Sequence, residues 1–278
     1  MTIESSSGAL VTVLEARDIQ ANVVAITQSG VSFGKPKKGF YLTGGLAGLG
    51  AINDASGVKV MGNLVVGAEG GFGLSGSSHT FQSNWALGNT YGFAINGTLH
   101  QVKENFANTN LTGFELTGTG HRLTGNIASA NHNHGFHLSG SGHLLSNNSA
   151  IANGNNGFVI ATSTANGHAL SNNAALGNVI FGFYVKSNAT ITKNLIYGNN
   201  SRVEPYSGQD FTNCGLLNLS GILITATNNF WGAPTGYGSD PADDGCIPSV
   251  GGRPLKLDPF VTKEFKIKTL TPLDELVL

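Results

Sequence analysis

A four-residue unit, Gly-Phe-x-aliphatic, returns at nearly constant spacing through the middle of this chain. Successive copies are separated by 21, 21, 22, 22 and 25 residues. The copies are GFGL at Gly71, GFAI at Gly92, GFEL at Gly113, GFHL at Gly135, GFVI at Gly157 and GFYV at Gly182. A repeat this short cannot bury an apolar face by itself, so its copies must stack on one another. This feature restricts the chain to a solenoid.

Within each repeat the apolar residues alternate along the chain, as Phe114 and Leu116 do on either side of Glu115. A period of two is typical of β-strands. Clusters of Gly and Asn separate the short strands and supply turns with positive φ. Each strand can then pair in parallel with its copy one coil later, about 4.8 Å along the axis. The sequence predicts an all-β, right-handed parallel β-helix with coils of 21 to 25 residues.

The whole chain is interpreted as one domain with capped ends. Residues 1–59 are less regular and are expected to form an N-terminal cap and the first imperfect coils, before regular coils over 60–232. Residues 233–278 are expected to form a C-terminal cap and tail, in which PFVTKEFKIKTL could pair with the last coil as a strand. Caps are expected because an open end exposes strand edges and the core.

Stacking places equivalent residues in columns along the axis. One core column contains the Phe residues of the Gly-Phe units, and a second contains Phe81, Val102, Leu123, Leu145, Leu170 and Ile191. Asparagines recur at one turn, where their side-chain amides can hydrogen-bond along the stack and satisfy a buried corner. This predicted structural ladder contains Asn84, Asn105, Asn126, Asn148, Asn173 and Asn194.

Five histidines share another position in the repeat: His79, His100, His121, His143 and His168. A metal site needs ligands that converge on one point, whereas these are translated along a line. We therefore favour a structural ladder over a metal or catalytic role, with pKa values lowered because stacked charged imidazoles would repel. The sequence HNHGFH adds His132, His134 and His137, of which two lie in a predicted turn and one on a strand. Turn histidines are favoured there over a zinc site.

Glu115 and His137 occupy the outward position of neighbouring Gly-Phe-x-aliphatic units, so they are expected to stand side by side. Tyr184 and Lys186 are expected two coils further along the same sheet. A carboxylate, an imidazole, a phenol and an amine on one face could perform acid/base chemistry on a sugar chain lying along the axis. The four residues are the predicted catalytic candidates, and the competing interpretation is a solvated surface.

The C-terminal part carries two further candidate features. Asp240, Asp243 and Asp244 lie close together in DPADDG and could bind calcium, which prefers several oxygen ligands, or could form an acidic turn. Cys214 and Cys246 are the only cysteines. A disulfide between them would close a loop of about 33 residues and contribute about 3 kcal/mol. Two free buried thiols are the alternative.

Composition excludes several classes of protein. Only 11% of residues are charged and the net charge is -1, whereas a typical domain has about 25% charged residues. No basic stripe is present to meet phosphates, so no nucleic-acid partner is expected. No apolar run approaches the roughly 20 residues of a membrane span, so no membrane span is expected. The first residues lack a basic region followed by an apolar stretch, so no signal peptide is expected within them. The even cysteine count in a polar chain favours an extracellular or cell-surface location.

The repeats over residues 60–232 resemble the PbH1-type right-handed parallel β-helix superfamily, which includes pectate lyases, polygalacturonases, alginate epimerases and the periplasmic copper protein NosD. The closing NNFWGAPTGYGSDPADDGC resembles the last coil of secreted bacterial β-helix repeat proteins of unassigned activity. The motifs that mark the enzymes are missing: the sequence has no NTD, no Asp-Asp pair on a central coil, no GHG followed by a basic motif and no DPHD. The resemblance therefore implies the fold, and an enzyme only by analogy.

Two functions remain open at this stage. The first is a non-catalytic extracellular module with an adhesive or matrix role and contact with polysaccharide, able to self-associate through its ends or sheet faces. The second is a polysaccharide lyase or epimerase with Lys186 or His137 as base, Tyr184 as proton donor and Glu115 as an orienting group. Ice binding is disfavoured because the outward column Gln82, Lys103, Thr124, Ser146, Ser171 and Thr192 is too mixed.

Overall fold

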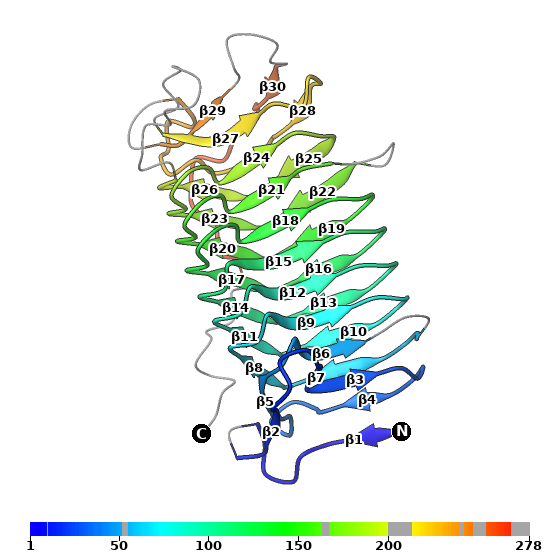
Figure 1. Ribbon diagram of the computed structural model, residues 1–278. Helices are drawn as coiled ribbons and strands as arrows, with labels where there is room; N and C mark the ends of the chain where they lie inside the picture. Colours follow the sequence, from blue (N-terminus) through cyan, green and yellow to red (C-terminus); the bar gives the residue numbers. More distant parts are fainter. Residues whose placement is uncertain are drawn as a thin grey trace.

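The chain folds as a right-handed parallel β-helix with three sheets along its axis (Figure 1). The computed structural model describes residues 1–9, 11–51, 55–162, 167–199, 213–238, 242–246 and 254–267, and no helix occurs among them. Every strand pairing between the named strands is parallel, as in β10 with β13, where Phe81 lies opposite Val102. The predicted fold class is confirmed.

From β1 to β27 the strands follow one another around the coil in the fixed order A, B, C, so each of these coils contributes one strand to each sheet. After β26 no further strand of sheet B occurs among the described residues. Sheet A consists of β1 (Thr2–Ile3), β4 (Ser32–Phe33), β7 (Lys59–Met61), β10 (Thr80–Gln82), β13 (Gln101–Lys103), β16 (Arg122–Thr124), β19 (Leu144–Ser146), β22 (His168–Ser171), β25 (Ala189–Thr192), β28 (Ile224–Thr225) and β30 (Leu255–Lys256). Sheet B consists of β2 (Val13–Ala16), β5 (Tyr41–Gly44), β8 (Leu64–Val66), β11 (Trp85–Leu87), β14 (Phe106–Asn108), β17 (Ile127–Ser129), β20 (Ser149–Ile151), β23 (Ala174–Leu176) and β26 (Leu195–Tyr197). Sheet C consists of β3 (Val24–Ile26), β6 (Ala47–Ala51), β9 (Gly70–Leu74), β12 (Tyr91–Ile95), β15 (Thr112–Leu116), β18 (Phe136–Leu138), β21 (Phe158–Ile160), β24 (Phe183–Val185), β27 (Cys214–Asn218) and β29 (Asp244–Cys246).

The core is filled by the predicted columns. The six Phe rings of sheet C are fully buried and stack with centroids 4.7 to 4.9 Å apart. The facing column of sheet B is small, because it contains Ala86, Ala107, Ala128, Ala150 and Ala175. Large rings on one sheet lie opposite methyl groups on another, which suits a narrow, close-packed interior.

The predicted Asn ladder is confirmed. It lies at the corner between sheets A and B, and we call it the first Asn ladder. In a typical rung, Asn126 Oδ1 accepts hydrogen bonds from Asn105 N at 2.9 Å and Asn105 Nδ2 at 3.0 Å. Asn126 Nδ2 also donates to the Val102 carbonyl at 2.8 Å. The ladder extends beyond its predicted ends to Asn63 and Asn229. It satisfies backbone and side-chain groups that would otherwise be buried without partners.

A second Asn ladder, which the sequence analysis missed, occupies the corner between sheets B and C. Its rungs are Asn89, Asn110, Asn131, Asn153, Asn178 and Asn199. The ladder ends at Asp243. Its carboxylate accepts hydrogen bonds from Gly198 N, Asn199 N and Asn199 Nδ2. Burial raises the pKa of Asp243 to about 6, although these three hydrogen bonds act to lower it.

The predicted His ladder forms the third corner, between sheets C and A. Each Nδ1 accepts a backbone N–H from the preceding coil, and each Nε2 lies 2.6 to 3.1 Å from a carbonyl of the preceding turn, as between His79 and Ser75. Burial lowers the pKa of His121 to about 3, and repulsion from neighbouring imidazoles contributes less. The predicted direction is confirmed, but burial rather than repulsion is the main cause.

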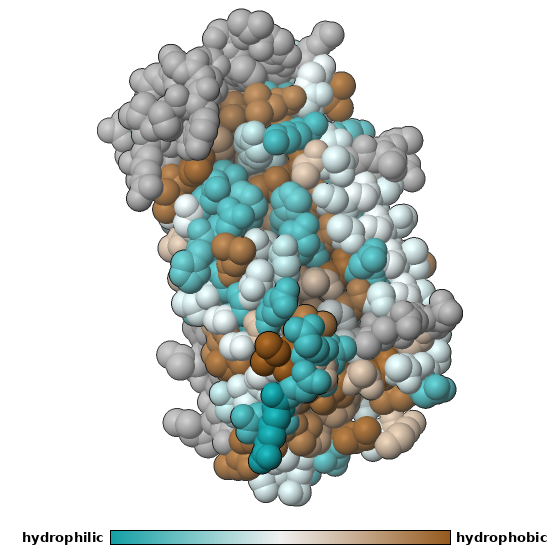
Figure 2. Space-filling view, in the orientation of Figure 1, coloured by the Kyte–Doolittle hydropathy of each residue, from teal (hydrophilic) through white to brown (hydrophobic). Residues whose placement is uncertain are grey.

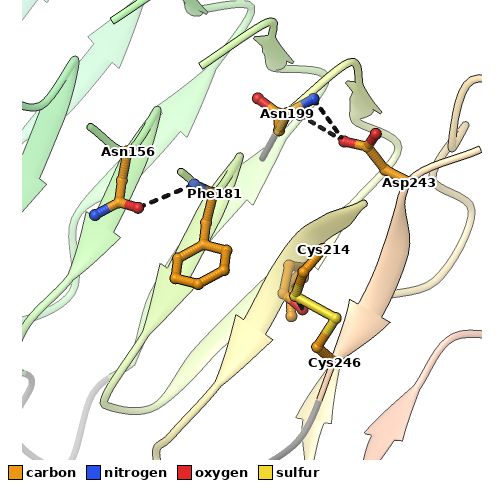
Figure 3. Close-up of a disulfide and its surroundings, with 7 residues drawn as sticks. Asn156, Phe181, Asn199, Cys214, Asp243 and Cys246 are labelled. Atoms are coloured by element: carbon orange, nitrogen blue, oxygen red, sulfur yellow. Dashed lines mark hydrogen bonds between the residues drawn. A yellow bond between two sulfur atoms is a disulfide. The ribbon is translucent and has the colours of Figure 1, made fainter. Parts of the chain in front are cut away.

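The C-terminal end is closed by covalent and apolar contacts. A disulfide joins Cys214 to Cys246, as predicted, and Figure 3 shows it near the contact between Asn199 and Asp243. The tail does not form the strand expected for PFVTKEFKIKTL among its described residues. Instead, side chains of the tail pack on the outside of sheet B, in a cluster with Leu195 and Phe230. Its alternating apolar side chains therefore cover the outer face of a sheet rather than extend one.

Candidate functional site

The site lies on the outer face of sheet C, along one column of residues that point away from the core. Inward Phe and aliphatic residues flank the members of this outer column from Gly73 to Tyr184, so the residue between them must face outward. In order along the axis the outer column contains Gly50, Gly73, Ala94, Glu115, His137, Val159, Tyr184 and Leu217. Unlike the core columns, it changes character from one coil to the next.

Glu115 and His137 are brought together as the sequence predicts. Glu115 on β15 is the register partner of His137 on β18, and its Oε1 lies 2.6 Å from His137 Nδ1. The side chains are 27% and 26% exposed, so both can meet a ligand. The contact makes Nδ1 the protonated ring nitrogen when the imidazole is neutral. The carboxylate and imidazole thus form one polar unit on the surface.

Tyr184 and Lys186 form a separate unit further along the sheet. Val159 lies between His137 and Tyr184 in the register, which puts two strand spacings, about 10 Å, between the two units. Lys186 Nζ lies 4.9 Å from the centroid of the Tyr184 ring, an attractive cation–π position. The four predicted residues therefore share one face as two pairs, and their catalytic roles remain a prediction.

His134 joins this face, although sequence reasoning treated it as an ordinary turn histidine. Its ring stacks on that of His137 with centroids 5.8 Å apart. Burial lowers the pKa of His134 to about 4, with smaller contributions from His137 and Lys186. His132 turns elsewhere, with Nδ1 3.2 Å from the Asn110 carbonyl. The histidines of HNHGFH therefore do not converge on one point.

A groove of about 320 Å³ runs along sheet C on the N-terminal side of Glu115. Gly50, Gly73 and Ala94 are the small members of the outer column here, and they line the groove without a large side chain to fill it. Polar side chains border this floor, and Glu115 stands at its end. The bordering residues with polar side chains are Asn22, Ser75, Asn96 and Thr117. In Figure 2 hydrophilic residues follow the long axis through the middle of the view. Sequence reasoning missed the groove, although the small residues before Glu115 in the outer column were its signal.

The predicted calcium site is only partly within the described residues, because Asp240 lies outside them. Asp243 is 2% exposed and directs its carboxylate to the second Asn ladder (Figure 3). Asp244 is half-buried at the start of β29. Among the described residues there is no group of three or more His, Cys, Asp or Glu side chains that could hold a metal ion. Calcium binding therefore remains a prediction, without Asp243 as an available ligand.

Comparisons with known proteins place the chain among β-helix proteins. The family model described as "Periplasmic copper-binding protein (NosD)" matches residues 5–236. The crystal structure of pectate lyase Pel9A aligns with 20% sequence identity and a TM-score of 0.49, covering 78% of this chain and 67% of that chain. No curated protein matches the sequence. Among the described residues there is no helix that is long and apolar enough to cross a membrane.

Proposed function

The chain belongs to the NosD family of periplasmic copper-binding proteins, and from that premise we propose that it is a non-catalytic module outside the cytoplasm that binds an extended polysaccharide. The groove along sheet C is the observation that carries the proposal. From Gly50 to Glu115 it follows three strand spacings, about 14 Å along the axis. The disulfide between Cys214 and Cys246 supports an oxidising, extracytoplasmic location.

Copper does not fit the donors that the described residues offer. Copper is bound in proteins by Cys, Met and His side chains. Both cysteines are joined in the disulfide, and the His ladder uses both ring nitrogens of each member in backbone contacts. His134 and His137 present stacked rings, and Nδ1 of His137 is held by Glu115. We therefore assign no copper-dependent step to the described part of this chain.

The shape of the groove suits a linear sugar polymer. Its glycine and alanine floor lets the carbon–hydrogen face of a sugar ring lie against the sheet, while hydroxyl and amide groups at its edges can bind the sugar hydroxyls. Asn96 Oδ1 accepts a hydrogen bond from Gly97 N at 2.7 Å, so Nδ2 is the group of this side chain that would donate to a sugar hydroxyl. A ligand bound in this way follows the helix axis and leaves the groove at Glu115.

The arrangement of acids favours binding over bond cleavage. A glycosidase uses two carboxyl groups that flank the scissile bond, and Glu115 is the one acid among the described residues that line the groove. The enzyme alternative draws on the contact between Glu115 and His137, a base oriented by a carboxylate. It also requires Tyr184 and Lys186 to act on the same sugar, across Val159.

A binding experiment with groove-filling variants tests the proposal. A Cβ added at Gly73 would meet only ordinary van der Waals contacts, at 3.9 Å from the Leu49 carbonyl oxygen, so Gly73→Leu should fold and fill the floor. Polysaccharide binding, measured by calorimetry, should fall at least about tenfold in this variant. Thr124→Leu, on the exposed outer face of sheet A, is the matched control and should bind normally. Equal binding by both variants would contradict the proposal, and release of unsaturated uronate would establish the lyase alternative instead.

A further inference from the structure

The groove has a charged side chain at one end, and this charge can determine whether charged or uncharged sugars bind. Its described lining residues include one ionisable side chain, Glu115, among small, polar and aliphatic ones. Lys186 belongs to the Tyr184 unit, three strand spacings or about 14 Å beyond Glu115 along the sheet. This distance exceeds the screening length of about 8 Å at physiological ionic strength. A ligand in the groove therefore meets a negative charge without a nearby lysine or arginine among the described lining residues.

The geometry of Glu115 turns this charge toward the groove. His137, its hydrogen-bond partner, lies on the side away from Ala94 and is not part of the groove lining. Oε1 is held by His137, while Oε2 has no hydrogen-bond partner among the described residues. A carboxylate oxygen is an acceptor only, so it can receive a sugar hydroxyl but repels another carboxylate. The carboxylate of Glu115, fixed by its contact with His137, is thus positioned to contact the sugar at the end of the groove.

We infer that Glu115 makes the groove selective for uncharged sugars and excludes uronates. This inference rests on the proposed polysaccharide binding and adds the class of polysaccharide. A neutral sugar gains a charge-assisted hydrogen bond from a hydroxyl to Glu115. A uronate in the same position brings a second negative charge into a partly desolvated site.

The test compares pairs of polymers that share a backbone and differ in charge. Polygalacturonate and its fully methyl-esterified form are the first pair, and polymannuronate and mannan are the second. Calorimetry at neutral pH and low salt should show that the wild-type protein binds the uncharged member of a pair at least about tenfold more tightly, equivalent to about 1.4 kcal/mol. High salt should reduce this ratio by screening the repulsion.

Two variants separate the inference from the proposed function. Glu115→Gln keeps an acceptor for His137 but removes the charge, and it should bring the binding ratio to within about twofold by strengthening binding of the acid. Gly73→Leu should weaken binding of both polymers. Equal or tighter binding of polygalacturonate by the wild type, or an unchanged ratio in Glu115→Gln, would overturn the selectivity while leaving polysaccharide binding intact. Failure of every polymer to bind would overturn both.

Discussion

The strands of sheet C form two neighbouring columns of side chains, one facing the core and one facing outward, and only the inward column repeats the same residue type. The inward column repeats Phe six times from Phe72 to Phe183, with ring stacks between 4.7 and 4.9 Å. The outer column, one residue further along each strand, changes from glycine through glutamate, histidine and valine to tyrosine over the same coils. The inner column must repeat because each ring packs on its own copy. The outer column has no such constraint.

The difference identifies where a solenoid can hold function. A side chain inside is chosen by its neighbours one coil away, so a change at one coil disturbs the stack on both sides. A side chain outside has no identical copy to stack on, so the residue type can change from one coil to the next, although Val159 and Leu217 are covered by neighbouring side chains. The groove and the pair of Glu115 and His137 lie where the outer column departs from uniformity. A repeat protein of this kind should therefore be searched for the positions that fail to repeat.

The largest effect is expected from breaking the inner column. Phe114 is fully buried between Phe93 and Phe136, so Phe114→Ala should lower the free energy of unfolding by about 4 kcal/mol through lost burial and a cavity. Chemical denaturation of the full chain measures the change. A loss below about 1 kcal/mol would mean that the stack collapses around the vacancy and that the column is less constrained than the comparison implies.

A second, smaller effect is expected where an interior ladder reaches the end of the helix. Asp243 has its pKa raised from 3.8 to about 6, mainly by burial, so the folded state binds a proton more tightly than the unfolded state. Stability should then fall as pH rises from about 4 to above 6, by about 2 to 3 kcal/mol from this group.

The matched variant for this prediction is Asp243→Asn, which cannot titrate but retains an amide oxygen to accept from Asn199. Unfolding curves recorded across this pH range should show a flatter dependence in the variant than in the wild type. Parallel pH profiles for the two proteins would show that another group controls stability there.

The interior was predictable from the sequence because translation along the axis turns spacing into contact. Asn105 and Asn126 are 21 residues apart, and that spacing alone places their amides within hydrogen-bonding distance. The second Asn ladder had the same signal, since Asn110 and Asn131 repeat at the same interval, five residues further along each coil. The role of Asp243 had no such signal, because it lies 44 residues after Asn199 and follows an interruption of the repeat.

The outer site was predictable only in part. The register puts Glu115 beside His137, and their contact follows directly from the repeat. The groove depends on several small residues and on the side chains that border it from the neighbouring turns, such as Asn22 and Thr117. Ser75, Asn96 and Thr117 repeat every 21 residues, each just after a strand of sheet C, whereas Asn22 comes from the irregular first coil and lies outside that series. The spacing of the repeats therefore predicts which residues are neighbours on adjacent strands, but it does not predict the depth of a groove.

The smallest effect on stability is expected at the residue next to Phe114 in the chain. Glu115→Ala removes a partly exposed contact with His137, and surface contacts of this kind contribute about 0.5 kcal/mol or less. The same denaturation experiment should thus separate adjacent residues by about eightfold in free energy, because Phe114 faces the core and Glu115 faces the groove. If Glu115→Ala were as damaging as Phe114→Ala, the outer column would be structural, and its variation would no longer identify the binding face. A near-neutral result together with altered sugar binding would tie the non-repeating column to ligand recognition.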